Sequence, residues 1–233
     1  YEDRLQFVGL HAHAGSGILG DDHATHLRMV DRLVTLATEA AARLPSLEYL
    51  DIGGGFGVPY HPDEEPLSLD ALAAAIDERM DSCPVQLAIE PGRYLVAPAG
   101  VLLSRVNTTK SGRTQAIVGI DAGMTTLLRP MLYDAFHPIA NLSAGPDRPH
   151  EPVTVTGPIC ETGDVLATER PMARPQRGDL LAIGITGAYG FEMASTYNMR
   201  PRPARVVLSD TGARLSVPHQ TLDELLRDRG VSR

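Results

Sequence analysis

The feature that most constrains the fold is a regular alternation of short apolar runs and helical segments over the first hundred residues. The apolar runs occupy residues 5–12, 47–52 and 85–90, which is the length of a buried strand. Between them, apolar residues recur at helical spacing over about 22–44 and 68–81. Strands about 40 residues apart with a helix in each gap are typical of βα units, so we expect a parallel sheet or barrel.

The second half of the sequence has a different pattern. After about residue 100 the helical spacing stops, and short β-like runs alternate with connections rich in proline and glycine. These runs lie at residues 101–107, 115–121, 152–157, 164–169, 179–187, 203–208 and 213–217, and a short helix is expected near 221–229. We therefore expect part of a (β/α)8 TIM-like barrel over residues 1–103 and a mostly antiparallel β domain over residues 104–233.

The composition of the 233 residues is that of a folded globular protein, with 43% hydrophobic and 21% charged residues. The net charge of −8 argues against nucleic acid as a partner, because a phosphate-binding surface needs clustered cations. No apolar run approaches the ~20 residues of a membrane span, and the two cysteines provide no disulfide framework, so we expect a cytoplasmic protein with no membrane partner. Lys110 is the only lysine in the sequence.

Polar clusters follow each of the three predicted strands of the first half. They run from His11 to Ser16, from Gly53 to Gly57 and from Glu90 to Arg93. In α/β barrels the active site collects at the carboxyl ends of the strands. We therefore expect the three clusters to contribute to one site.

Each cluster also allows a structural interpretation. The glycines at 53–55 either form a turn that needs positive φ or present backbone N–H groups to an anion. His11 and His13 alternate onto one face of their strand, but no third ligand has suitable spacing, so no metal site is expected. Glu90 ends an apolar strand and needs a partner there, which is either Arg93 or a protonated heterocyclic nitrogen on a cofactor.

Six longer motifs extend over nearly the whole chain. The first half contains GLHAHAGSG, LDIGGGFGVPY and IEPGRYLVAPAGVLL, and the second half contains DAGMTTLLRPMLYDAFH, GPICETGDVLA and GAYGFEMASTYNMRPRPA. In this order they resemble the barrel and β-domain motifs of the fold-type III PLP-dependent decarboxylases, the family of diaminopimelate, ornithine and arginine decarboxylases. The resemblance implies pyridoxal 5′-phosphate (PLP) as the cofactor, an amino acid as the substrate, and decarboxylation as the reaction.

The resemblance assigns roles to residues around the predicted cofactor. His13 would stack on the face of the PLP ring, and Glu90 would pair with the pyridine nitrogen and keep it protonated. The phosphate would be held by hydroxyl, backbone and guanidinium groups of Ser16, Gly53, Gly54, Gly55, Gly92, Arg93 and Tyr189. His13 and Glu90 are, with Cys160, the residues that the resemblance implies in catalysis.

The resemblance also implies a homodimer with shared active sites, because Cys160 and Glu161 would act in the site of a neighbouring subunit. There Cys160 would help to protonate the carbon that loses CO₂, and Glu161 would bind the distal amine of the substrate. Arg129 and Tyr133 in LLRPMLY, with Glu161 in CETGD, resemble the diaminopimelate branch, which implies conversion of meso-diaminopimelate to L-lysine in lysine biosynthesis.

Substrate contacts are thus implied for Arg93, Arg129, Tyr133, Glu161 and Tyr189. The two arginines would offer forked guanidinium contacts to the distal carboxylate. Considered without the resemblance, Arg129 could instead form an ion pair at the surface or at an interface.

The sequence departs from the family in one respect. The family's Schiff-base lysine lies on the first barrel strand, upstream of the His-x-Gly-Ser motif, whereas Lys110 lies in the predicted polar turn TTKSGR. We therefore expect the C-terminal part of a longer enzyme, with the lysine supplied by an upstream segment. Two alternatives stay open: a decarboxylase of a carrier-linked or citryl-linked amino acid in secondary metabolism, and a non-catalytic binding or regulatory relative.

Overall fold

A computed structural model describes residues 4–21, 23–111 and 116–231. The chain forms two compact units, Tyr1–Pro98 and Ala99–Arg233. The boundary that we expected after residue 103 lies inside the first strand of the second unit, which begins at Leu102. The predicted turn TTKSGR and the predicted run 115–121 both extend into residues 112–115, which lie outside the described residues.

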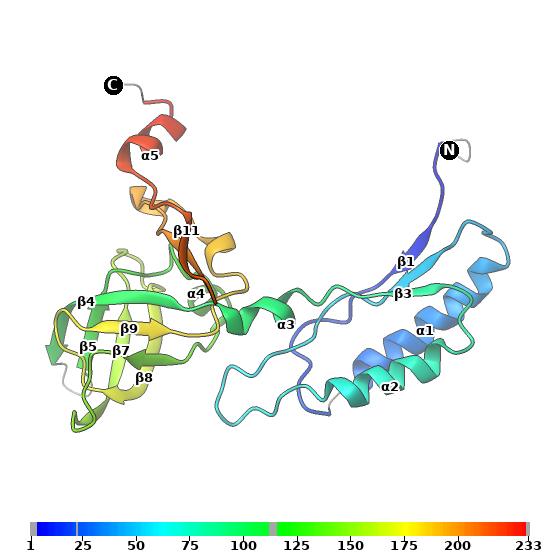
Figure 1. The fold of residues 1–233 in the computed structure, drawn as a ribbon, viewed down its shortest axis with the longest axis horizontal. Coiled ribbons are helices and arrows are strands. Elements are labelled where there is room, and N and C mark those ends of the chain that lie inside the picture. Colours follow the sequence, from blue (N-terminus) through cyan, green and yellow to red (C-terminus); the bar gives the residue numbers. More distant parts are fainter. Residues whose placement is uncertain (1–3, 22, 112–115, 232–233) are drawn as a thin grey trace. The chain divides into compact units, whose positions relative to one another are not determined.

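The first unit contains a parallel sheet with helices on one side. Its strands are β1 (Gly9–His11), β2 (Tyr49–Asp51) and β3 (Gln86–Ala88), in that order, with His11 opposite Asp51 and Asp51 opposite Ala88. Helices α1 (Ala24–Ala41) and α2 (Leu69–Met80) lie side by side along the sheet (Figure 1). The parallel βα arrangement agrees with the sequence pattern, and the three strands found here form an open sheet.

The core of this unit lies between the two helices and the sheet. Apolar residues of α1 at helical spacing, Val30, Leu33 and Ala37, are buried against Leu50 of β2 and Leu72 of α2. Because these residues recur on one face of each helix, their removal from water holds the helices on the sheet. The segment after β3 also turns helical, as α3 (Gly92–Val96) and η1 (Ala97–Ala99), which the Pro- and Gly-containing sequence did not predict.

The second unit is built on a six-stranded sheet. The strands are β4 (Leu102–Ser111), β5 (Ala116–Ile120), β6 (Ile139–Asn141), β7 (His150–Thr156), β8 (Val165–Ala173) and β9 (Leu180–Ile183). Their order is β6-β9-β4-β5-β7-β8, and only β5 and β7 pair in parallel, so the prediction of a mostly antiparallel domain is confirmed.

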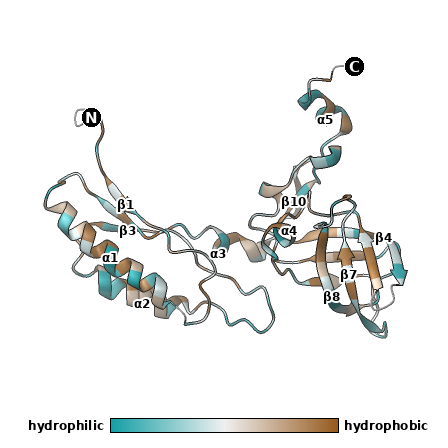
Figure 2. Cartoon of the chain, turned by 180° about the vertical axis from the view of Figure 1, so that it is seen from behind, coloured by the Kyte–Doolittle hydropathy of each residue, from teal (hydrophilic) through white to brown (hydrophobic). Residues whose placement is uncertain are grey.

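The two edge strands, β6 and β8, lie close to each other, so the sheet is nearly closed. Asn141 of β6 donates a hydrogen bond from Nδ2 to the carbonyl of Ala173 of β8 (3.3 Å). Valines and other apolar residues fill the interior, including Val106, Val118, Val153, Leu181 and Ile183, each at most 1% exposed. Figure 2 colours much of β7 and β8 as hydrophobic, as expected for strands whose side chains enter a core.

Shorter elements complete the second unit. These are α4 (Arg129–Tyr133), η2 (Phe191–Met193), η3 (Tyr197–Met199), the hairpin of β10 (Arg205–Ser209) and β11 (Gly212–Val217), and α5 (Leu222–Asp228). A reciprocal pair of hydrogen bonds between Thr221 and Glu224 caps the start of α5. Neither α4 nor β6 was predicted, because each has only a few residues, too short for a periodic pattern.

Lys110 lies in β4, opposite Ile117, and not in a turn as the sequence suggested. It is exposed there, on a strand of the second unit. Within the described ranges, no helix has both the length and the apolar character that crossing a membrane requires.

Candidate active site

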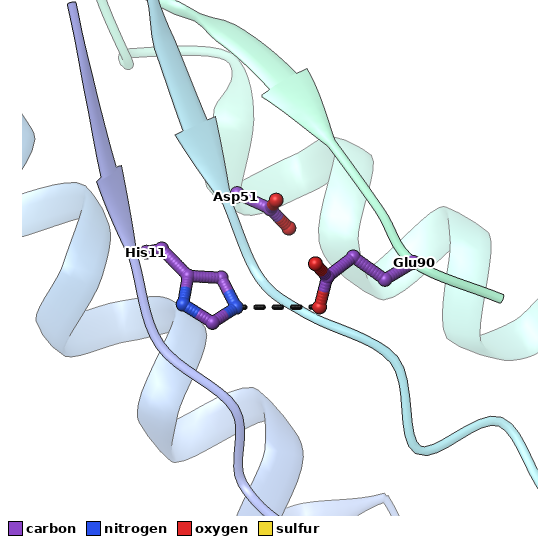
Figure 3. A group of neighbouring side chains, drawn as sticks. All are labelled: His11, Asp51 and Glu90. Carbon is purple, nitrogen blue, oxygen red and sulfur yellow. Dashed lines mark hydrogen bonds and ion pairs between the residues drawn. The ribbon is translucent and has the colours of Figure 1, made fainter. Parts of the chain in front are cut away.

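The carboxyl ends of the three parallel strands bring His11, Asp51 and Glu90 together. His11 ends β1, Asp51 ends β2, and Glu90 lies two residues beyond β3. Figure 3 shows the three side chains at the same end of the sheet, with His11 Nε2 3.3 Å from Glu90 Oε2. The side chains of His11 and Glu90 are 51% and 56% exposed, so the group is open to a ligand.

The partner of Glu90 differs from the one considered from the sequence. We weighed an ion pair with Arg93, but the carboxylate pairs with His11. The guanidinium of Arg93 instead lies over the ring of Tyr60, 5.9 Å from its centre. Within the described residues, the carboxylate of Glu90 therefore has an imidazole and not a guanidinium as its partner.

His11, Asp51 and Glu90 also have the donor atoms of a metal site. One ligand atom from each lies within 4.8 Å of the others, and this is the one such group among the residues that the structure describes. The sequence did not suggest it, since the three residues lie about 40 positions apart and meet only through strand pairing. One carboxylate oxygen of Asp51 already accepts a hydrogen bond from the N–H of Gly53 (2.8 Å).

The glycine segment after β2 is packed against the other two strand ends. Gly53 and Gly55 have φ values of 71° and 97°, in the left-handed region that glycine adopts without strain. A Cβ on Gly54 would lie 2.3 Å from the carbonyl oxygen of Glu90, and one on Gly55 would lie 2.3 Å from that of Gly15. The triplet is therefore required for close backbone approach, and not only for turning the chain.

Two of the three glycine amides are already used inside the protein. The N–H of Gly53 binds Asp51, and the N–H of Gly54 donates to Nδ1 of His13 (3.3 Å). The tautomer of His13 that accepts this bond carries its proton on Nε2. The amide of Gly55 has no acceptor among the described residues, and the exposed side chain of Ser16 comes from the neighbouring loop.

These groups fit the cofactor that the resemblance implies. The Gly55 amide and the Ser16 hydroxyl are donors suited to a phosphate, and Glu90 is a carboxylate suited to a protonated ring nitrogen. The amide of Gly92 is less suited to an anion, because it donates to the carbonyl of Glu90 (2.9 Å). The fit therefore rests on a narrower set of donors than the sequence motifs suggested.

In the second unit, Cys160 and Glu161 lie in the loop between β7 and β8, and both are exposed. The hydroxyl of Tyr197 donates a hydrogen bond to Oε1 of Glu161, and Nδ2 of Asn198 lies 3.6 Å from Sγ of Cys160. The hydrogen bond and the negative charge of Glu161 raise the pKa of Tyr197 above its ordinary value. Sequence reasoning missed both partners, although they stand together in the motif STYNMRPRPA.

The loop that carries Cys160 and Glu161 is anchored by Asp164. Its side chain is buried, and its two oxygens accept hydrogen bonds from the amides of Met124 and Ile159, both at 2.6 Å. Glycines leave room for the carboxylate: a Cβ on Gly123 or Gly157 would lie 2.5 or 2.3 Å from Oδ1 of Asp164. Asp164 was not identified from the sequence, because only the folded chain shows that it is buried.

Arg129 lies in α4 and is only 5% exposed, so its side chain is not at the surface of the described chain. Its Nη1 lies 3.0 Å from Nε2 of His137, whose Nδ1 lies 2.9 Å from the carbonyl oxygen of Gly184. His137 is completely buried and was also missed. Tyr133, at the end of the same helix, is 63% exposed.

Tyr189 has a φ of 57° and is 45% exposed. A tyrosine in this left-handed conformation is uncommon and favours a functional role for its side chain. The predicted residues thus form two groups, one within each unit: His13, Ser16, Gly53, Gly54, Gly55, Glu90, Gly92 and Arg93 in the first, and Arg129, Tyr133, Cys160, Glu161 and Tyr189 in the second.

The sequence and the fold are similar to those of known decarboxylases. The chain is 40% identical to the diaminopimelate decarboxylase of Methanothermobacter thermautotrophicus over 232 residues, which cover 96% of this chain and 54% of that protein. The crystal structure of AQ1208 from Aquifex aeolicus matches with a TM-score of 0.92 at 35% identity, covering 97% of this chain and 56% of the other.

The diaminopimelate decarboxylase of Helicobacter pylori complexed with L-lysine matches with a TM-score of 0.89 at 33% identity, covering 97% of this chain and 56% of the other. The chain thus spans about half the length of the relatives it matches. The family described as pyridoxal-dependent decarboxylase, C-terminal sheet domain, matches residues 29–187. With its motifs, its two units and these matches in agreement, the chain belongs to the pyridoxal-dependent decarboxylase family.

Proposed function

We propose that the protein carrying this chain is a PLP-dependent decarboxylase that converts meso-diaminopimelate to L-lysine in the cytoplasm. The observation that carries the proposal is the meeting of His13, the glycine turn and Glu90 at the carboxyl ends of three parallel strands. This is the end of a βα sheet where ligands bind. The names of the relatives support the choice of substrate.

The first unit would hold PLP as part of a (β/α)8 barrel. The Ser16 hydroxyl and the Gly55 amide would bind its phosphate with Arg93 and Tyr189, and His13 would lie against its ring. The cofactor, when bound, supplies an electron sink for the electron pair released as CO₂ leaves. Glu90 would hold a proton on the ring nitrogen, and the contact with His11 would orient the Glu90 carboxylate.

The second unit would recognise the distal end of the substrate. Glu161 carries the charge that an ammonium group needs, and Arg129 with Tyr133 supplies donors for a carboxylate. Since Arg129 is buried and held by His137, its guanidinium would contribute from a fixed position. Cys160 would deliver a proton from Sγ to the substrate carbon that loses the carboxylate.

We also propose a homodimer in which Cys160 and Glu161 act in the partner's site. The test is complementation between two inactive variants of the full-length protein, Cys160→Ala and Glu90→Gln. Co-expressed heterodimers contain one site free of both substitutions if the sites are shared. Verified heterodimers that recover no activity would contradict shared sites.

The substrate assignment is tested by CO₂ release from the full-length protein supplied with PLP. The substrates are meso-diaminopimelate, lysine, ornithine and arginine, and release from meso-diaminopimelate alone is expected. Release from none of the four, with PLP bound, would favour a carrier-linked or citryl-linked substrate. Absence of PLP binding would favour a non-catalytic relative.

A further inference from the structure

Two adjacent residues of η3 contact the two adjacent residues that the proposed function assigns to catalysis and substrate binding. Tyr197 donates to Glu161, and Asn198 contacts Cys160. Each residue of the pair 197–198 contacts one residue of the pair 160–161, more than thirty positions earlier in the sequence. A single turn therefore contacts both functional side chains of the loop between β7 and β8.

The turn has an unusual backbone that is itself held in place. Asn198 and Met199 have φ values of 52° and 58°, which non-glycine residues rarely adopt in succession. The amide of Ser195 donates to the carbonyl of Thr125 (2.9 Å), and Arg229 contacts the hydroxyl of Thr196 at 3.4 Å. A conformation of this kind persists only where the surroundings determine it, which favours a role for the side chains it presents.

We propose that Tyr197 is a positioning residue that fixes the carboxylate of Glu161 for the distal amine of the substrate. The inference rests on the proposed function of Glu161. The Tyr197 hydroxyl contacts Oε1, which leaves Oε2 of Glu161 to accept a hydrogen bond from an ammonium group. A donor at one oxygen also limits the rotation of the carboxylate, so less conformational freedom is lost when the substrate binds.

The experiment is a double-mutant cycle in the full-length protein with PLP bound. The variants are Tyr197→Phe, Glu161→Gln and the double substitution, and kcat and KM are measured with meso-diaminopimelate. Tyr197→Phe should raise KM about 3- to 10-fold with a smaller change in kcat, as fits a solvent-exposed hydrogen bond to a charged group. The double variant should match Glu161→Gln, because Tyr197 acts through that carboxylate.

A second readout uses the cofactor-free protein. Tyrosine ionisation is followed by ultraviolet absorbance as the pH is raised. Since Glu161 raises the pKa of Tyr197, Glu161→Gln should move one tyrosine to a lower titration midpoint. Glu151→Gln is the matched control, because it removes a carboxylate of β7 that pairs with Arg174 and leaves Glu161 in place.

The outcomes separate the two proposals. If Glu161→Gln raises KM but Tyr197→Phe does not, or if their effects on KM simply multiply, the positioning role is overturned and the role of Glu161 stands. If Glu161→Gln leaves KM unchanged, the proposed role of Glu161 fails. The tyrosine titration tests the contact itself. A lower midpoint in Glu161→Gln but not in Glu151→Gln supports the contact between Tyr197 and Glu161, and an unchanged midpoint overturns the positioning role.

Discussion

Replacing Gly54 by alanine should disturb the candidate cofactor site directly, because it forces apart two of the strand ends that form it. The new Cβ would lie 2.3 Å from the carbonyl oxygen of Glu90, where real Cβ contacts stay beyond 3.0 Å. The glycine turn and the backbone of Glu90 must therefore separate by about 0.7 Å or more. The oxygen belongs to the main chain of Glu90 and the new Cβ is bonded directly to the main chain of residue 54, so no flexible side chain can move aside to relieve the contact.

The magnitude follows from this displacement. A shift near 1 Å in a positioned catalytic group costs about 10²-fold in rate, or about 2.7 kcal/mol of transition-state stabilisation. Overpacking adds a stability loss of about 1 to 3 kcal/mol. We therefore expect kcat for decarboxylation to fall about 100-fold and the melting temperature to fall.

The assay is turnover by the full-length protein at saturating PLP, measured beside thermal unfolding. Gly145→Ala is the matched control: nothing lies within 4 Å of a Cβ built there, so both quantities should stay near their normal values. A Gly54→Ala variant with turnover within about threefold of normal and an unchanged melting temperature would refute the steric argument.

Three further predictions concern single carboxylates and one histidine. Glu90→Gln should lower turnover about 10²-fold at saturating PLP, which corresponds to a loss of about 2.7 kcal/mol of transition-state stabilisation, with little change in melting temperature. Near-normal turnover with a lowered melting temperature would make Glu90 structural. Asp164→Asn should destabilise the protein by about 2 to 4 kcal/mol in denaturant unfolding, because an amide group replaces an oxygen that faces a backbone N–H; unchanged stability would contradict the anchoring role. Burial, with the nearby His13 and His23, lowers the pKa of His26 below 6.5. The unfolded chain then takes up the proton first, so stability should fall as pH drops below about 6.5, and a flatter profile is expected for His26→Met; equal slopes for the two proteins would disprove this linkage.

Much of the fold follows from local pattern. The helical spacing of Val30, Leu33 and Ala37 predicts α1 because a helix must place its buried residues on one face. The change of pattern near residue 100 predicts the change from βα units to a mostly antiparallel sheet. Elements of three to five residues, such as β6 and α4, escape this reasoning because they contain too few repeats.

The candidate site was predicted in its residue types more fully than in its contacts. The positions of His13 and Glu90 at the ends of predicted strands indicated a site, and the resemblance to the decarboxylase family implied roles for Cys160 and Glu161. The sequence singled out His11 but not its contact with Glu90. Tyr197 and Asn198, which contact Glu161 and Cys160, have no local signature, and neither do Asp164 and His137, so these four were identified only from the structure.

The sequence by itself determined the longer helices and strands and which side chains are available for chemistry, because both depend on residue type and on spacing along the chain. The tertiary structure alone decided that Glu90 pairs with His11 and not with Arg93, and that Arg129 is buried beside His137. It also decided that Asp51 and His13 use two of the three glycine amides internally. The contacts of Glu90 with His11 and of Gly54 with His13 join residues 79 and 41 positions apart. Their distances depend on strand pairing and close backbone approach, which no local pattern records.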